Sequence, residues 1–271
     1  MKNHIFCVLI ALTLLSACAS AATPAPATPT VTPAPTPTPE PTWVLVWADE
    51  FEAPDGSAVD PKKWRFDTGS GGWGNNELQY YTDTTDNAYI EDGNLVIKAE
   101  AVDSWERYTS ARLVTRGEAS WVYGRFEIRA KLPIGQGIWP AIWMLPAGWH
   151  YGGWPVGGEI DIMEYLGHEP SRVHGTLHYG NPHTYKGTYY DLAEGTFADD
   201  FHVFALEWEP EEIRWYVDDH LVQTQTEWFT SSDRGEYPAP FDKPFNLLIN
   251  VAVGGQWPGN PDETTEFPQY M

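Results

Sequence analysis

The chain has 271 residues, a formal net charge of −22 and an aromatic content of 14%, with 14 tryptophans. Such an acidic chain is a poor partner for nucleic acid, whose binding depends on basic side chains placed on phosphates. The same charge disfavours sulfated or carboxylated polysaccharides, although only the local charge counts inside a binding cleft. Composition therefore favours a neutral partner.

The first 18 residues resemble an export signal. Lys2 precedes an apolar run over residues 5–15, which is too short to span a bilayer. The ending at residues 15–18 (LSAC) is similar to a bacterial lipoprotein box, in which Cys18 would be lipidated and become the new N-terminus. The alternative is an ordinary signal peptide cut near residues 19–22. Both alternatives predict an exported protein, either held at the cell envelope by its lipid or secreted.

A linker and one domain follow the signal. Residues 19–42 are almost entirely Ala, Thr and Pro, so they cannot bury a core and are expected to form a semi-rigid linker. Residues 43–271 are long enough for a single all-β domain, which we expect to be a monomer. Both cysteines, Cys7 and Cys18, precede this domain. Its stability must therefore come from core burial rather than from a disulfide.

Short apolar or alternating runs recur throughout the domain, separated by clusters of Gly, Pro, Asn and Asp. No long segment shows a helical period. The pattern predicts a two-sheet antiparallel sandwich, with tight hairpin turns at residues 92–94 and 217–220. The expected strands are 44–51, 63–67, 88–91, 94–102, 108–115, 121–131, 137–145, 157–165, 171–179, 201–209, 212–218, 220–224 and 244–253.

Polar side chains that could line one binding site are spread along the domain. They include amides in the loop 74–80, a cation within an otherwise apolar strand, three residues that share one face of the predicted strand 171–179, and a group near the C-terminus. In chain order they are Asn75, Arg112, His174, Thr176, His178, Asn250, Gln256 and Trp257.

Three tryptophans stand close in sequence to an acidic segment. Trp139 and Trp143 share one face of the predicted strand 137–145, and Trp154 lies in the Gly-rich loop that follows. Small-molecule sites combine apolar walls with a few polar groups, and aromatic rings can stack on the apolar faces of sugars. We expect these tryptophans to form a sugar-binding platform, with core packing as the alternative.

The acidic segment is residues 158–165 (GEIDIMEY), in which three carboxylates stand between β-branched neighbours. On a regular strand Glu159 and Asp161 share a face, but Glu164 would point into the apolar side, where an unpaired carboxylate is unfavourable. A β-bulge near Ile162 and Met163 would return Glu164 to the face of the other acids and direct Met163 into the core. The segment therefore predicts three acids on one face of a bulged strand.

This segment, with residues 137–146 (GIWPAIWMLP) before it and 174–180 (HGTLHYG) after it, resembles glycoside hydrolase family 16, specifically its laminarinase-like endo-β-1,3-glucanases. The resemblance extends from Val46 to Tyr270. It includes residues 72–79 (GWGNNELQ), 109–113 (TSARL), 123–127 (YGRFE) and 251–258 (VAVGGQWP). The family's lichenases have a related acid spacing without the extra residue, so Met163 indicates the laminarinase-like group.

The resemblance implies a β-jelly-roll sandwich of the concanavalin A-like kind, with a glycan-binding cleft on its concave face. It implies a retaining mechanism in which Glu159 is the nucleophile and Glu164 first protonates the leaving oxygen and then deprotonates water. Asp161 would tune both glutamates. The substrate contacts that it implies are Asn75, Arg112, Trp139, Trp143, His178, Asn250 and Trp257.

The chain departs from the family pattern at its end, where residues 268–271 (PQYM) are not followed by the usual final strand. Because a neighbouring strand would then keep unpaired backbone groups, we expect a chain longer by about ten residues to be more stable. Equal melting temperatures would contradict this expectation. No cofactor is required by the resemblance. A structural Ca²⁺ stays open, since one aspartate ligand would come from that final strand.

These observations predict an exported endo-acting hydrolase of β-1,3-glucans such as laminarin, or of mixed β-1,3/1,4-glucans. A transglycosylase or an agarase-like enzyme of the same family is the nearest alternative. A non-catalytic glucan-binding protein is disfavoured because all three acids are present. A metal site is disfavoured because the cluster lacks the spread-out oxygen ligands of a calcium loop.

Overall fold

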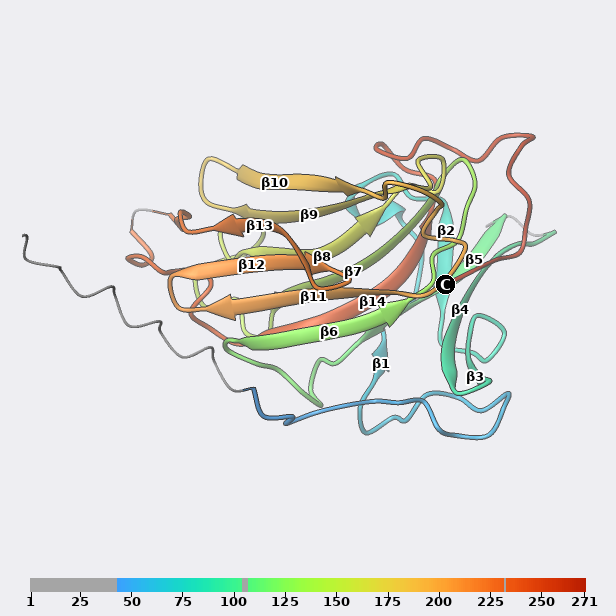
Figure 1. Ribbon diagram of the computed structural model, residues 1–271, viewed down its shortest axis with the longest axis horizontal. Coiled ribbons are helices and arrows are strands. Elements are labelled where there is room, and N and C mark those ends of the chain that lie inside the picture. The colour runs from blue at the N-terminus through green and yellow to red at the C-terminus, as the bar shows by residue number, and fades with distance from the viewer. Residues whose placement is uncertain (1–42, 104–106, 232) are drawn as a thin grey trace, which may run out of the picture. The chain divides into compact units, whose positions relative to one another are not determined.

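Two stacked β-sheets make up the described part of the chain, which is residues 43–103, 107–231 and 233–271 of the computed structural model (Figure 1). The predicted signal and linker, residues 1–18 and 19–42, lie outside it. One short 3-10 helix, Gly72–Gly74, interrupts the strands. Within the described ranges, no helix has the length and apolar character needed to cross a membrane.

The larger sheet consists of β1 (Arg65–Phe66), β2 (Gln79–Thr82), β3 (Ala88–Glu91), β4 (Asn94–Ala101), β5 (Tyr108–Val114), β7 (Ile138–Pro146), β8 (Glu159–Tyr165), β9 (Arg172–Tyr179), β10 (Thr184–Asp191), β14 (Phe245–Val253) and β15 (Gln269–Tyr270). Its main path is β10-β9-β8-β7-β14-β5-β4-β15. The pair β2 and β5 is parallel, whereas the pairs along the main path are antiparallel.

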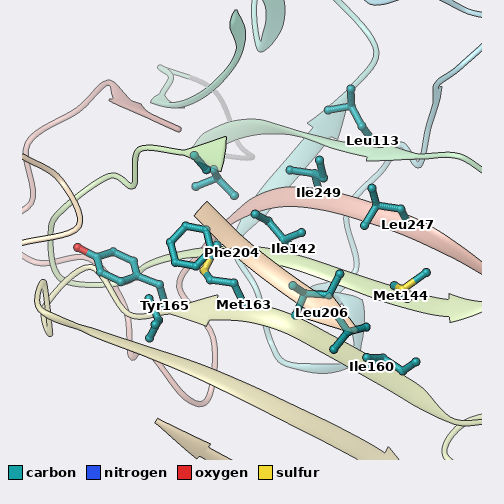
Figure 2. Close-up of a cluster of buried hydrophobic side chains, with 14 of the residues drawn as sticks. Leu113, Ile142, Met144, Ile160, Met163, Tyr165, Phe204, Leu206, Leu247 and Ile249 are labelled. Atoms are coloured by element: carbon teal, nitrogen blue, oxygen red, sulfur yellow. The ribbon is translucent and has the colours of Figure 1, made fainter. Parts of the chain in front are cut away.

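The smaller sheet consists of β6 (Gly124–Ala130), β11 (His202–Glu209), β12 (Glu212–Val217) and β13 (His220–Gln225), in the order β13-β12-β11-β6. The apolar faces of the two sheets enclose the core (Figure 2). Ile160 and Met163 of β8 lie there with Phe204 and Leu206 of β11. Burying one such side chain contributes about 1.5–3 kcal/mol, so this core can hold the domain together.

Most predicted strands agree with the structure to within a few residues, but the predicted strand 44–51 is wrong. Residues 44–46 are 77%, 82% and 80% exposed, and none of the described strands pairs with them. The segment is held by a side chain instead. The ring of Trp47 packs edge-on against Trp64 and Trp121, with centroids 5.8 and 5.4 Å away. Apolar residues alone do not form a strand without a neighbouring backbone.

Three observed strands, β2, β10 and β15, were not predicted. The sequence of β10 (TYKGTYYD) is rich in Thr and Tyr, which favour strands, but a glycine and two adjacent tyrosines break the regular alternation that marks a strand. At the other edge, β15 pairs with β4, and Met271 exchanges backbone hydrogen bonds of 3.0 and 2.9 Å with Ile97. The effect of a longer chain on stability stays a prediction.

Both predicted hairpin turns are confirmed. Asp92 and Gly93, between β3 and β4, have φ angles of 51° and 70°. Asp218 and Asp219, between β12 and β13, have φ angles of 48° and 63°. Two successive positive φ angles define the tight turn whose twist matches the strands that it joins.

The predicted bulge in β8 is also confirmed. Asp161 and Met163 pair with two adjacent residues of β7, Trp143 and Ile142, so the extra residue is Ile162 rather than the Met163 that the sequence suggested. The register against β9 shifts over the same stretch. Ile162 and Met163 are both buried. The bulge thus leaves two consecutive apolar side chains inside the protein.

A tryptophan from the smaller sheet completes the hydrogen bonding of this bulge. Nε1 of Trp215, on β12, donates to the backbone carbonyl of Asp161 at 2.8 Å, and the bond is buried. Gly175 of β9 makes room for the indole, because a Cβ there would lie 2.6 Å from the Trp215 ring. The bulge is therefore held against the opposite sheet.

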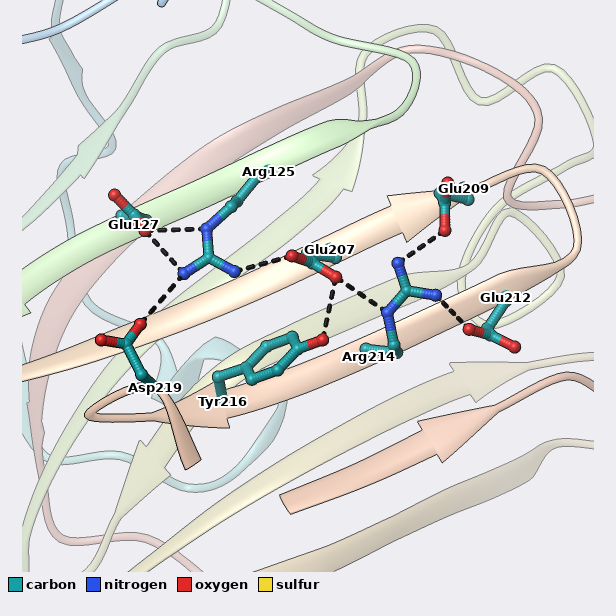
Figure 3. Close-up of polar contacts among 8 residues, drawn as sticks. All are labelled: Arg125, Glu127, Glu207, Glu209, Glu212, Arg214, Tyr216 and Asp219. Carbon is teal, nitrogen blue, oxygen red and sulfur yellow. Dashed lines mark hydrogen bonds and ion pairs between the residues drawn. The ribbon is translucent and has the colours of Figure 1, made fainter. Parts of the chain in front are cut away.

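The outer face of the smaller sheet carries an ion-pair network (Figure 3). Glu207 accepts hydrogen bonds from Arg125 at 2.7 Å, Arg214 at 2.8 Å and Tyr216 at 2.9 Å. Burial acts to raise the pKa of Glu207, but these donors outweigh it and hold that pKa below its usual value. The arginines also bind Glu127, Glu209, Glu212 and Asp219. The network links β6, β11 and β12, the strand that carries Trp215.

Replacing Trp215 by Phe should keep an aromatic ring and remove the donor. We expect the free energy of unfolding to fall by about 1–3 kcal/mol, because the Asp161 carbonyl would be buried without a partner. We also expect kcat to fall, because the acids would lose their fixed spacing. Thermal unfolding and steady-state kinetics measure the two effects.

Trp208→Phe is the matched control. Nε1 of Trp208 donates to the carbonyl of Phe241 at 3.0 Å, in another buried bond whose acceptor is not on β8. This variant should lose comparable stability and keep its kcat. If the two variants had the same kcat, the link between Trp215 and the acids would be wrong.

Candidate active site

The bulge places three carboxylates on one face of β8. Glu159, Asp161 and Glu164 each pair with a residue of β9, which lies beside β8. Asp161 is 2% exposed, and the two glutamates are half-buried. These carboxylates are called the acid row below.

Burial raises the pKa of each member of the acid row. The pKa of Glu159 rises to about 8 through burial and the charge of Glu164, and that of Glu164 rises to about 7 through burial. Burial and both glutamates hold the pKa of Asp161 well above its usual range. Like charges this close do not all ionise together, so the row titrates as a set and keeps protons near neutral pH.

Arg112, which packs between two tryptophans, lowers the pKa of one member of the acid row, Glu159. The guanidinium of Arg112 lies 4.7 Å from the ring centroids of both Trp73 and Trp143, and its Nε lies 3.3 Å from Asp67. Its positive charge lowers the pKa of Glu159 and opposes the effect of burial. Arg112 therefore favours the ionised form of Glu159.

A different tryptophan acts on each glutamate. The Trp154 indole lowers the pKa of Glu159. Nε1 of Trp139 lies 3.3 Å from Oε1 of Glu164, and this bond lowers the pKa of Glu164. Indoles thus act on both glutamates, and the one from Trp139 holds Glu164 by a hydrogen bond.

Two histidines extend the row at the Glu159 end. Nε2 of His178 lies 3.4 Å from Oδ2 of Asp161, and its Nδ1 lies 3.0 Å from Nε2 of His183. Burial, followed by the charge of His183, lowers the pKa of His178 to about 4. His178 is therefore neutral at neutral pH. His183 was not predicted, because its exposed position after β9 carries no pattern.

A polar network connects the predicted amides on the other side of the row. Nε1 of Trp143 donates to Asn250 at 2.7 Å, and Asn250 donates to the Tyr81 hydroxyl at 3.1 Å. Tyr81 and Asn75 both donate to Glu77, at 3.2 and 3.3 Å. Neither Glu77 nor Tyr81 was singled out from the sequence, although Glu77 lies within the loop 74–80.

The predicted tryptophans differ in exposure. Trp154 and Trp257 are 51% and 43% exposed, as a sugar platform requires, whereas Trp139 is only 9% exposed. Trp257 packs edge-on against both Trp139 and His174, with ring centroids 5.6 and 4.9 Å away. Trp139 shares the face of the acids, is buried in a small cluster with Leu166 and Ala252, and contacts Glu164 through its Nε1. Thr176, also predicted, lies on β9 opposite Asp161, and Gln256 is exposed.

Three of these side chains could hold a metal ion. Glu159, Asp161 and His178 each offer one ligand atom, and the atoms lie within 4.8 Å of one another. A cation there would bind the carboxylates that the chemistry needs. That the site requires no metal or other cofactor stays a prediction, and a structural Ca²⁺ elsewhere stays open.

An acid row with raised pKa values, indole donors and exposed aromatic rings on a jelly-roll sandwich defines a carbohydrate-cleaving site. Residues 75–269 match the family model described as glycosyl hydrolases family 16, and the chain belongs to this family. The family and the jelly-roll sandwich expected from the sequence are confirmed.

Known proteins are similar over most of the chain. A beta-glucanase of Rhodothermus marinus is 52% identical over 238 residues, covering 84% of this chain and 82% of that protein. A glucan endo-1,3-beta-glucosidase of Cryptopygus antarcticus is 43% identical over 240 residues, covering 83% and 86%. The solved structure of the laminarinase from Rhodothermus marinus has a TM-score of 0.76 and 48% identity, covering 85% of this chain and 95% of that one.

Replacing Trp139 by Phe should change the pH dependence of activity. The variant lacks the Nε1 donor that lowers the pKa of Glu164, so this pKa should rise. A general acid acts only while protonated, so activity should persist to higher pH. We expect the alkaline limb of the kcat/KM profile to move up by about 0.5 pH unit.

The control for this measurement is Trp143→Phe. The indole of Trp143 donates to Asn250 rather than to an acid, so its loss should leave the alkaline limb in place. A limb that stays fixed or moves down in Trp139→Phe would contradict the role of Glu164 as the acid.

Proposed function

We propose that this protein is an exported, retaining endo-glycoside hydrolase that cleaves β-1,3-glucans such as laminarin, or mixed β-1,3/1,4-glucans, as a monomer. The observation that carries the proposal is the acid row, in which Glu159 and Glu164 are brought to one face by the bulge. The names of the relatives, a beta-glucanase and a glucan endo-1,3-beta-glucosidase, support this substrate class.

In the first step Glu159 attacks the anomeric carbon and forms a glycosyl-enzyme, while Glu164 gives its proton to the leaving glycosidic oxygen. In the second step ionised Glu164 takes a proton from water, whose oxygen attacks the anomeric carbon and releases Glu159. The charge of Arg112 supports the ionised nucleophile. Asp161, whose pKa burial and both glutamates hold well above its usual range, lies on the same face as Glu159.

The surroundings of the row suit a neutral glucan. Exposed Trp154 and Trp257 offer flat apolar rings near the two ends of the acid row. Half-buried Asn75 lies on the other side and offers hydrogen bonds to hydroxyls, while buried Asn250 holds the indole of Trp143 in place. We propose that the glucan lies across this face of the larger sheet, in the expected cleft.

The decisive experiment measures reducing ends released from laminarin, lichenan, agarose and carrageenan. The wild type should act on the β-glucans, and Glu159→Gln and Glu164→Gln should lose about 10³-fold or more of the activity. Exposed Glu211→Gln is the control and should keep full activity. Full activity in Glu159→Gln would reject the nucleophile, and release from agarose alone would favour the agarase-like alternative.

The anomer and the length of the products distinguish a retaining hydrolase from a transglycosylase and from a glucan-binding protein. The anomer of the first product, followed by NMR, should keep the β configuration of the substrate if the mechanism is retaining. Products longer than the starting oligosaccharide would indicate a transglycosylase. Glucan binding by the wild type without release of reducing ends would indicate a binding protein.

We also propose that Cys18 carries a lipid anchor, because the ending LSAC follows an apolar run with Lys2 before it. In a bacterial host the wild type should fractionate with membranes and incorporate labelled palmitate. Cys18→Ala should abolish labelling, whereas Cys7→Ala, within the apolar run, should keep it. An unlabelled wild type recovered in the soluble fraction would support the ordinary signal peptide instead.

A further inference from the structure

We propose that Tyr185 and Tyr189 of β10 form a glucosyl-binding subsite next to the acid row. The proposal rests on the proposed function and adds a strand that the sequence did not predict. The ligand is one neutral sugar unit of the glucan, bound at a distance from the bond that is cleaved.

Strand register places both tyrosines on the face of the acids. Tyr185 pairs with His178, which pairs with Glu159. Tyr189 pairs with His174, which pairs with Glu164. Directly opposed residues of neighbouring strands point to the same face of a sheet. Each tyrosine therefore continues a row that begins at a catalytic glutamate.

The spacing of the strands suits a sugar unit beyond the reacting one. Neighbouring strands lie about 4.8 Å apart, so β10 lies roughly 10 Å from β8. Residues four positions apart in a strand are roughly 13 Å apart, which separates the two tyrosines. They frame a strip that leads from the acids to the edge of the sheet.

The middle of this strip carries only small side chains on β9 and β10. Gly187 stands between the tyrosines on β10 and pairs with Thr176, which pairs with Asp161. A Cβ on Gly187 would lie 2.6 Å from the Gly175 carbonyl oxygen and 2.7 Å from Oγ1 of Thr176. Only a glycine fits between these neighbours, and the Thr176 hydroxyl beside it can accept or donate a hydrogen bond.

Both tyrosines are exposed and held in place. Tyr185 is 69% exposed and Tyr189 is 52% exposed. The Arg172 guanidinium lies 4.0 Å from the Tyr189 ring centroid and donates to Asp191 at 2.7 and 3.0 Å. The Tyr185 ring lies 5.9 Å from the ring of His178. Binding a ligand to rings that are already positioned loses little side-chain entropy.

The charges on β9 and β10 favour a neutral ligand. Arg172 of β9 is paired with Asp191, and Lys186 of β10 is paired with Glu227 at 2.9 Å. These cations have carboxylate partners, and a sulfate or carboxylate group on the ligand would compete with them. Flat rings and a hydroxyl, by contrast, match the apolar face and the hydroxyl groups of a glucosyl unit.

The test uses a β-1,3-linked glucose hexamer labelled at its reducing end. Tyr185→Ala and Tyr189→Ala should each raise KM about tenfold, equal to ~1.4 kcal/mol, with kcat within about twofold of wild type. The labelled products should show that the preferred cleavage position has shifted, and the direction of the shift tells which end of the glucan crosses β10. Tyr185→Phe and Tyr189→Phe keep the rings and should resemble the wild type.

Thr188→Ala is the matched control, because Thr188 is exposed on the same strand but points to its other face. If an alanine variant melts below the assay temperature, Tyr185→Leu and Tyr189→Leu keep apolar bulk without a flat ring and replace it. Wild-type KM and cleavage positions in folded variants of both tyrosines would overturn the subsite. An inactive wild type would instead contradict the proposed function, so the two failures are distinguishable.

Discussion

One hydrogen bond between the sheets governs the geometry of the active site. A bulge interrupts the regular ladder, so the Asp161 carbonyl needs a partner from elsewhere. Trp215 supplies it across the core at 2.8 Å, and Gly175 gives the indole room. Because the donor stands on β12, the spacing of the acids depends on how both sheets pack, and the ion pairs around Glu207 help to hold that second sheet.

Burial raises the pKa of all three carboxyls in the acid row, but it does not assign the roles of nucleophile and general acid. The charge of Arg112 favours an ionised Glu159, and neutral His178 adds no competing positive charge near Asp161. These groups offset burial only in part, because the pKa of Glu159, about 8, still lies above that of Glu164, about 7.

The sequence predicted what depends on near neighbours. Alternation within β8 was enough to infer the bulge, and Asp-Gly or Asp-Asp pairs were enough for the turns. The failures involve partners that are distant in sequence. The segment 44–51 has the composition of a strand but no backbone beside it, whereas β10 has the backbone but a weak pattern. Likewise, the bond from Asn250 to Tyr81 joins residues 169 positions apart, and no local motif indicates it.

The extra residue in β8 also has a consequence for how such a site can evolve. Without Ile162, the segment would read EIDMEY, in which acidic and apolar residues still alternate regularly. The three acids would keep their common face. What the bulge adds is a bend and a longer step between Asp161 and Glu164. Gain or loss of a single residue therefore converts one acid spacing into another without turning any carboxylate into the core.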